Sequence, residues 1–142
     1  VQEQLIRKRI QDIKAQGGIA AVSGTPVAAM RFRKAIAEAG ADLFFVQATV
    51  VSTNHIGPEG QATLDLEELC QGMGLPVVIG NCVTYEVALQ LMRAGAAGVM
   101  VGIGPGAACT SRGVLGVGIP QALSWRRHGL TAGRTGQNPA AA

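Results

Sequence analysis

The feature that most constrains the fold is a corner that occurs twice, in which a helix ends at a glycine and an apolar strand follows. Residues 39–41 and 94–96 both read Ala-Gly-Ala, and the apolar runs 43–46 and 99–101 follow closely. Glycine ends a helix readily because it adopts the left-handed conformation that the C-terminal turn requires. A short run without polar alternation is typical of a strand buried on both faces of a parallel sheet. The corner therefore predicts an α/β chain.

The same alternation of strand and helix extends along most of the chain. Apolar runs that predict strands begin at Ile19, Leu43, Val77 and Val99. Strict alternation predicts a parallel sheet with the helices outside it. A complete (β/α) barrel has eight such units and roughly 250 residues, so we expect about half a TIM barrel. A doubly wound sheet has the same periodicity and stays open as an alternative at this point.

Helices are predicted where a capping residue precedes apolar residues at helical spacing. Thr25, followed by proline, Asp65 and Thr84 are the expected caps of three of them. The expected buried faces are, in chain order, Ile6, Ile10 and Ile13; Phe32, Ala35, Ile36 and Ala39; Leu66, Leu69, Cys70 and Met73; and Tyr85, Ala88, Leu89 and Met92.

The last predicted strand leads into a loop, residues 102–112, that contains alternating glycines and a cysteine. Gly102, Gly104 and Gly106 come first, and Cys109 stands at the far end. Alternating glycines allow a sharp turn and bring backbone amides and carbonyls close to a ligand. From the residues alone, Cys109 is equally open to interpretation as a nucleophile or as an inert thiol.

This loop and its flanks resemble the IMP dehydrogenase/GMP reductase family. Residues 102–111 and the later Gly-Val-Gly-Ile-Pro-Gln at 116–121 are similar to the family's active-site loop. The resemblance covers about residues 18 to 122 and includes residues 76–81 and 94–96. It looks closest to the IMP-dehydrogenase-related paralogue branch, given residues 45–47 and 81–85.

The resemblance implies a purine nucleotide oxidoreductase of the IMP dehydrogenase type. Such an enzyme converts IMP, NAD and water to XMP and NADH through a covalent thioimidate, here on Cys109. GMP reductase, which converts GMP and NADPH to IMP and ammonia, is the alternative within the family. A third reading is an inactive truncated fragment or an association module. The resemblance also implies NAD or NADP as cofactor, potassium as a possible ion, and a homotetramer.

Specific site residues follow from the resemblance. Cys109 is the expected catalytic residue, and the expected substrate-binding residues are Asn81, Gly106, Ala107 and Ser111. The expected cofactor-binding residues are Gln47, Gly102 and Gly104, and the backbone carbonyls of Gly104, Gly106 and Cys109 are the expected potassium ligands. Two positions depart from the family, because Ala107 replaces a serine that helps to hold phosphate and Gln47 replaces an aspartate that supports the cofactor ribose.

A dinucleotide-binding Rossmann fold is the competing reading of the glycines. Gly102, Gly104 and Ala107 fit the spacing of that fingerprint. The fingerprint also requires an acidic residue about 20 positions later. All nine acidic residues lie at or before Glu86, which excludes this reading.

Charge and cysteine content narrow the class of protein. The C-terminal third is purely basic, which can attract a phosphate, but it contains a single aromatic residue, Trp125, and no nucleic acid partner is expected. The three cysteines have no metal-ligand spacing, so we expect a reduced, cytoplasmic protein. Cys70 and Cys82 are interpreted as packed thiols. No apolar run approaches the ~18 residues that span a bilayer.

The chain changes character near residue 122. Residues 1–122 are predicted to form the partial barrel, and residues 123–142 a disordered tail foreign to the family, since they lack any periodic pattern. Residues 47–63 are predicted to form a long loop, on which His55 is interpreted as a solvated surface residue.

Overall fold

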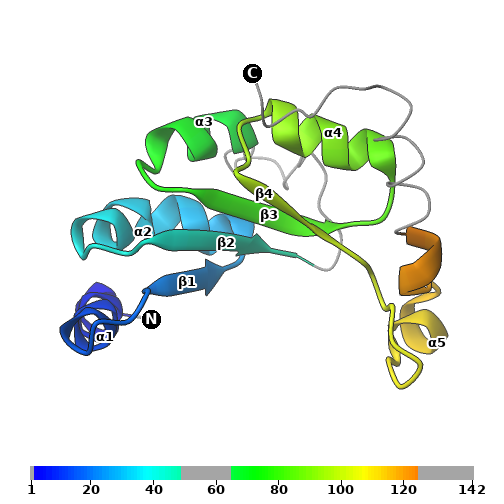
Figure 1. Ribbon diagram of the computed structural model, residues 1–142, viewed down its shortest axis with the longest axis horizontal. Coiled ribbons are helices and arrows are strands. Elements are labelled where there is room, and N and C mark those ends of the chain that lie inside the picture. The colour runs from blue at the N-terminus through cyan, green and yellow to red at the C-terminus, as the bar shows by residue number, and fades with distance from the viewer. Residues whose placement is uncertain (1, 49–64, 125–142) are drawn as a thin grey trace.

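The computed structural model describes residues 2–48 and 65–124 of the 142-residue chain. Within these ranges the chain forms one four-stranded sheet with helices packed on it (Figure 1). In chain order the elements are α1 (Glu3–Ala15), β1 (Ala21–Gly24), α2 (Pro26–Glu38), β2 (Leu43–Gln47), α3 (Leu66–Gly72), β3 (Val77–Cys82), α4 (Tyr85–Arg93), β4 (Gly98–Val101) and α5 (Ser111–Leu115). Residues 121–124 are also helical.

The strand order distinguishes a barrel from a doubly wound sheet. All neighbouring strands pair in parallel, and their order in the sheet is β1-β2-β3-β4. A doubly wound sheet reverses its strand order at a switch point, and these four strands show no reversal. The structure therefore has the sequential parallel (β/α) units of a TIM barrel, in agreement with the prediction of about half a barrel.

The core lies between the sheet and α2, α3 and α4. Alternate residues of the strands point to this side, as the pleat of a strand requires. The largest contributors from the strands and helices are Phe44, Val46, Val77, Ile79, Phe32, Ile36, Leu66, Leu69 and Leu91, all buried. Full burial of side chains of this size contributes about 1.5–3 kcal/mol each, and this layer therefore holds the helices on the sheet.

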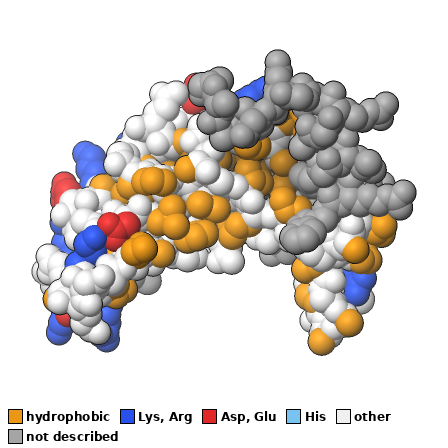
Figure 2. Space-filling view, viewed as in Figure 1, with side chains coloured by type: hydrophobic (Ala, Val, Ile, Leu, Met, Phe, Trp, Pro, Cys, Tyr) orange, Lys and Arg blue, Asp and Glu red, His pale blue; other side chains and the backbone are white. Residues whose placement is uncertain are grey.

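The other face of the sheet is also largely apolar. Leu43, Phe45 and Val78 alternate with the buried positions and, like Met100 of β4, are half-buried. In a barrel, side chains on this face fill the interior. Figure 2 shows apolar side chains gathered in the hollow between the part of the molecule that holds α1 and the part that holds α5.

Three predicted helix caps and two predicted stripes are confirmed. Thr25 Oγ1 accepts from the Ala28 amide at 3.3 Å, Asp65 Oδ1 from the Glu67 amide at 2.9 Å, and Thr84 Oγ1 from the Val87 amide at 3.4 Å. The predicted faces of α2 and α3 are the ones that the structure turns toward the sheet. Capping satisfies backbone amides that have no partner inside the helix, which is why these sequence signals are reliable.

The predicted buried face of α4 is wrong by part of a turn. Ala88 and Leu91 are the buried residues, whereas Met92 is 37% exposed and Leu89 is half-buried. Val87, Ala88 and Leu91 form a second apolar stripe on the same helix, and the position of α4 over β3 and β4 selects it. Amphipathic spacing alone does not choose between two overlapping stripes.

The first helix and strand also differ from the sequence prediction. Ile13 is 40% exposed, and β1 begins at Ala21, two positions after the predicted start at Ile19, which is 78% exposed. Pairing decides this start, because Ala21 is the first residue with a partner in β2, Leu43.

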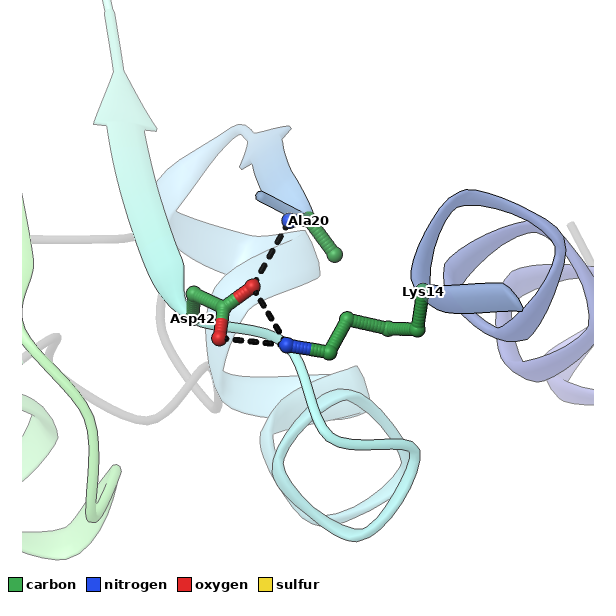
Figure 3. Close-up of polar contacts among 3 residues, drawn as sticks. All are labelled: Lys14, Ala20 and Asp42. Carbon is green, nitrogen blue, oxygen red and sulfur yellow. Dashed lines mark hydrogen bonds and ion pairs between the residues drawn. The ribbon is translucent and has the colours of Figure 1, made fainter. Parts of the chain in front are cut away.

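A carboxylate joins α1 to the start of the sheet (Figure 3). Asp42 Oδ1 and Oδ2 lie 2.7 Å and 2.9 Å from Lys14 Nζ, and Oδ2 also accepts from the Ala20 amide at 2.8 Å. The hydrogen bond from Lys14 and then the Ala20 amide lower the pKa of Asp42 below its ordinary value. This carboxylate ties the end of α1 to the segments that enter β1 and β2.

Two predicted segments fall mostly outside the described residues. The long loop at 47–63, with His55, is described only at residues 47 and 48, and the predicted tail at 123–142 only at residues 123 and 124. Among the helices that the structure describes, none is long and apolar enough to cross a membrane.

Candidate active site

The cysteine loop leaves the sheet at the carboxyl end of β4. Gly102, Ile103 and Gly104 are buried at its base, and residues 105–110 are exposed. Gly102 and Gly104 have φ angles of 127° and 53°, a region that side chains rarely adopt. The loop lies at the carboxyl end of the parallel strands, which is the edge where barrel enzymes place their chemistry.

Two side-chain amides hold the base of the loop. Asn81 Nδ2, from β3, donates to the Gly102 carbonyl at 2.8 Å, and Gln121 Nε2 donates to the Val101 carbonyl at 3.1 Å. The Gly102 amide itself donates to the Cys82 carbonyl at 2.8 Å. The adjacent carbonyls of Val101 and Gly102 thus accept hydrogen bonds from two sides. The donor to Gly102 comes from the neighbouring strand β3, and the donor to Val101 comes from the segment that follows α5.

The segment after α5 returns along the outgoing arm of the loop. The Ile119 amide donates to the Ile103 carbonyl at 2.9 Å. A Cβ on Gly118 would lie 2.5 Å from Arg112 Cγ and 2.9 Å from the Ile103 carbonyl oxygen. The close approach of the two arms therefore requires glycine at this position, which gives a physical reason for the Val-Gly-Ile-Pro-Gln pattern.

Cys109 is exposed on this loop and has a polar partner. Its Sγ lies at hydrogen-bond distance from Ser111 Oγ, 3.3 Å away. Hydrogen bonds from the side chain and the backbone of Ser111, together with the positive charge of Arg112, lower the pKa of the Cys109 thiol. A thiolate is the nucleophilic form of cysteine, so the loop favours the reactive state.

The other two cysteines have the opposite environment. Cys82 is buried at the end of β3, and Cys70 is half-buried in α3. Burial raises the pKa of both thiols, because an apolar environment disfavours the thiolate. Among the three cysteines, Cys109 is the exposed one and the one whose pKa is lowered.

The remaining predicted site residues lie at the same edge of the sheet. Gln47 ends β2 and pairs in register with Gly80, next to Asn81. Gln47 Oε1 accepts a hydrogen bond from Ser23 Oγ at 2.9 Å, which leaves its Nε2 to donate elsewhere. Within the described part of the chain, Cys109 Sγ bonds to Ser111 and to neither Gln47 nor Asn81. Gly106 and Ala107 lie exposed on the loop.

Arg112, in the first turn of α5, is a residue whose contact with the cysteine loop the sequence reasoning missed. Its guanidinium donates to the Gly106 carbonyl at 3.3 Å, and the Cys109 amide donates to the same oxygen at 3.2 Å. A carbonyl oxygen has two lone pairs, and both are engaged at Gly106. The Gly106 carbonyl, one of the three expected potassium ligands, therefore already accepts two hydrogen bonds. The sequence contained one related feature, Gly118, a glycine at which the side chain of Arg112 approaches the backbone closely. The sequence alone does not identify Arg112 as the residue that requires this glycine.

Comparison with known proteins gives consistent matches. The sequence model described as IMP dehydrogenase / GMP reductase domain matches residues 3–133, past the boundary predicted at 122. The chain is 34% identical over 121 residues to an uncharacterized oxidoreductase of Mycolicibacterium smegmatis, a match that covers 84% of this chain and 32% of that protein. It is 37% identical over 103 residues to inosine-5'-monophosphate dehydrogenase of Cryptosporidium parvum, covering 72% and 24%.

A solved structure agrees with these matches. The crystal structure of an IMP dehydrogenase/GMP reductase-like protein from Corynebacterium glutamicum superposes with a TM-score of 0.78 at 28% identity, covering 96% of this chain and 35% of that one. The chain thus spans about a third of the length of such relatives and corresponds to part of their barrel. The chain belongs to the IMP dehydrogenase/GMP reductase family of oxidoreductases.

Proposed function

We propose that this chain supplies the nucleophile of a purine nucleotide oxidoreductase of the IMP dehydrogenase type. The observation that carries the proposal is the exposed Cys109, whose pKa is lowered by Ser111, on a glycine loop at the carboxyl end of β4. A nucleophile needs both access and a populated thiolate. Burial instead raises the pKa of Cys70 and Cys82.

The proposed reaction follows from the chemistry of the purine ring. The Cys109 thiolate adds to C2 of IMP and forms a carbon–sulfur bond, after which the hydrogen at C2 leaves with its electron pair as hydride. When bound, NAD supplies the acceptor for this hydride. Water then adds to C2, the carbon–sulfur bond breaks and the thiolate leaves, which gives XMP and one proton.

The chain's own residues have separate roles in this scheme. Once Cys109 has lost its proton, the Ser111 hydroxyl would donate to the sulfur and so stabilise the thiolate both before attack and on departure. Asn81 and Gly102 hold the loop at the sheet edge, where the nucleotide would be bound. Gln47 fits a neutral contact to a ribose hydroxyl, because its Nε2 remains available as a donor. Ala107 lacks the hydroxyl with which the family's serine helps to hold the substrate phosphate.

Covalent labelling tests the proposal. A thiolate displaces chloride from a 6-chloropurine nucleotide and forms a carbon–sulfur bond as the carbon–chlorine bond breaks. We expect the label on Cys109 in peptide mass spectra, and we expect excess IMP to slow it.

Two variants make the labelling experiment specific. Cys109→Ala should abolish the IMP-sensitive label, whereas Cys82→Ala should leave it unchanged. IMP-sensitive labelling at Cys82 would contradict the assignment. Equal labelling of all three cysteines that IMP does not slow would mean that the loop does not bind a nucleotide.

A further inference from the structure

The side chain of Arg112 crosses the cysteine loop in a space that two glycines leave open. A Cβ on Gly118 would lie 2.5 Å from Arg112 Cγ, and a Cβ on Gly104 would lie 3.5 Å from it. The stem of Arg112 therefore passes between the outgoing and returning arms of the loop. At the end of this path the guanidinium donates to the Gly106 carbonyl at 3.3 Å.

That carbonyl is one of the three that the family resemblance implies as potassium ligands. Its second lone pair accepts the Cys109 amide at 3.2 Å. A potassium ion would have to replace one of these donors, and it would then stand beside a guanidinium that shares the same oxygen. Like charges at such a distance repel strongly outside bulk water. The loop already contains a positive charge where the ion would contribute one.

We infer that the guanidinium of Arg112, in place of a bound potassium ion, supplies the positive charge that orders the cysteine loop. The inference concerns the same loop as the proposed function and rests on it only for the importance of Cys109. Arg112 is a positioning residue, since it acts on Cys109 through the Gly106 carbonyl. The loop of this chain should therefore be ordered equally well with and without potassium.

Hydrogen exchange of the loop tests this inference without any nucleotide. The exchange rate of peptides spanning residues 104–112 is measured in potassium chloride and in choline chloride at the same ionic strength, because salt screens exposed charges. We expect equal rates for the unmodified chain. We expect Arg112→Met to exchange roughly fivefold faster in choline, the loss that one hydrogen bond predicts, and to recover in potassium.

Further variants separate the role of the charge from a general loss of structure. Arg112→Lys keeps a positive charge and should retain protection in choline. Arg9→Met, which removes a side chain that is 80% exposed on α1, is the matched control and should leave the loop unchanged. Peptides from β3 report whether each variant remains folded.

Three results would overturn the inference. The first is slower exchange of the unmodified loop in potassium than in choline. The second is exchange of Arg112→Met at the unmodified rate in choline, and the third is exchange of this variant that stays fast in potassium. Failure of the labelling experiment would leave this assay readable, because it uses no substrate, and the two ideas can thus fail separately.

Discussion

The side chain of Gln121 lies directly against the Cα of Gly102. A Cβ on Gly102 would stand 2.4 Å from Gln121 Oε1, while Gln121 Nε2 donates to the carbonyl of the preceding residue, Val101. The side chain of Gln121 thus joins the segment after α5 to the end of β4, where the loop that carries Cys109 begins. The contact explains why the family-like pattern at 116–121 accompanies the glycine loop although it lies well after the cysteine.

Gly102→Ala should therefore destabilise the chain. The Cβ overlaps Gln121, and a φ of 127° disfavours any side chain. We expect a loss of about 1–3 kcal/mol in the free energy of unfolding, measured in urea. Gly113→Ala is the matched control, because a Cβ there meets no atom within 4 Å. Adding Gln121→Ala should recover part of the loss, and simple additivity of the two changes would contradict the contact.

Ser111→Ala should raise the pKa of Cys109. The variant removes the hydroxyl that contributes most to stabilising the thiolate, while the Ser111 backbone amide and Arg112 remain. The pH profile of iodoacetamide labelling at Cys109 should move to higher pH, so that labelling below the new pKa is slower. Thr110→Ala is the control, because the Thr110 side chain makes no capping hydrogen bond. An unchanged profile for Ser111→Ala would show that the hydroxyl does not act on the sulfur.

Leu91→Ala should cost far more stability than Met92→Ala. Leu91 is a fully buried residue of α4, and its truncation leaves a cavity that costs about 2–5 kcal/mol. Met92 is 37% exposed, so its truncation should cost less than about 1 kcal/mol. Urea unfolding of the two variants measures both losses. Comparable losses would support the stripe predicted from sequence over the one in the structure.

Asp42→Asn should weaken the chain at neutral pH and flatten its response to acid. Because Lys14 and the Ala20 amide lower the pKa of Asp42 in the folded state, the carboxylate contributes stability above the ordinary value of 3.8. This contribution is lost as the pH falls through the folded pKa. The difference between the unmodified chain and the variant should therefore shrink below pH 3.8.

The acid series needs a control carboxylate. Asp12→Asn removes a group whose partner, Arg9, is 3.5 Å away and 80% exposed, and it should change little at any pH. Thermal unfolding across the pH series measures both variants. A stability difference for Asp42→Asn that persists at the lowest pH would mean that the ionised carboxylate is not the source.

Local patterns of the sequence determined the number, type and caps of most elements in this chain. Thr25, Asp65 and Thr84 cap helices because their oxygens accept from amides only two or three residues away, an interaction that needs no tertiary contact. The glycine loop with its cysteine could also be recognised from the sequence, because its order of residues carried the family resemblance that the comparisons confirm.

Tertiary structure alone decided the strand order, the buried stripe of α4 and the partners inside the loop. Sequential pairing of β1 to β4 joins residues far apart in the chain, and no local pattern specifies which edges meet. Leu91 is buried in place of Met92 because of where α4 lies on the sheet. Arg112 reaches the Gly106 carbonyl because the chain turns back on itself between the two residues. Such a contact depends on three-dimensional geometry that spacing in the sequence does not encode.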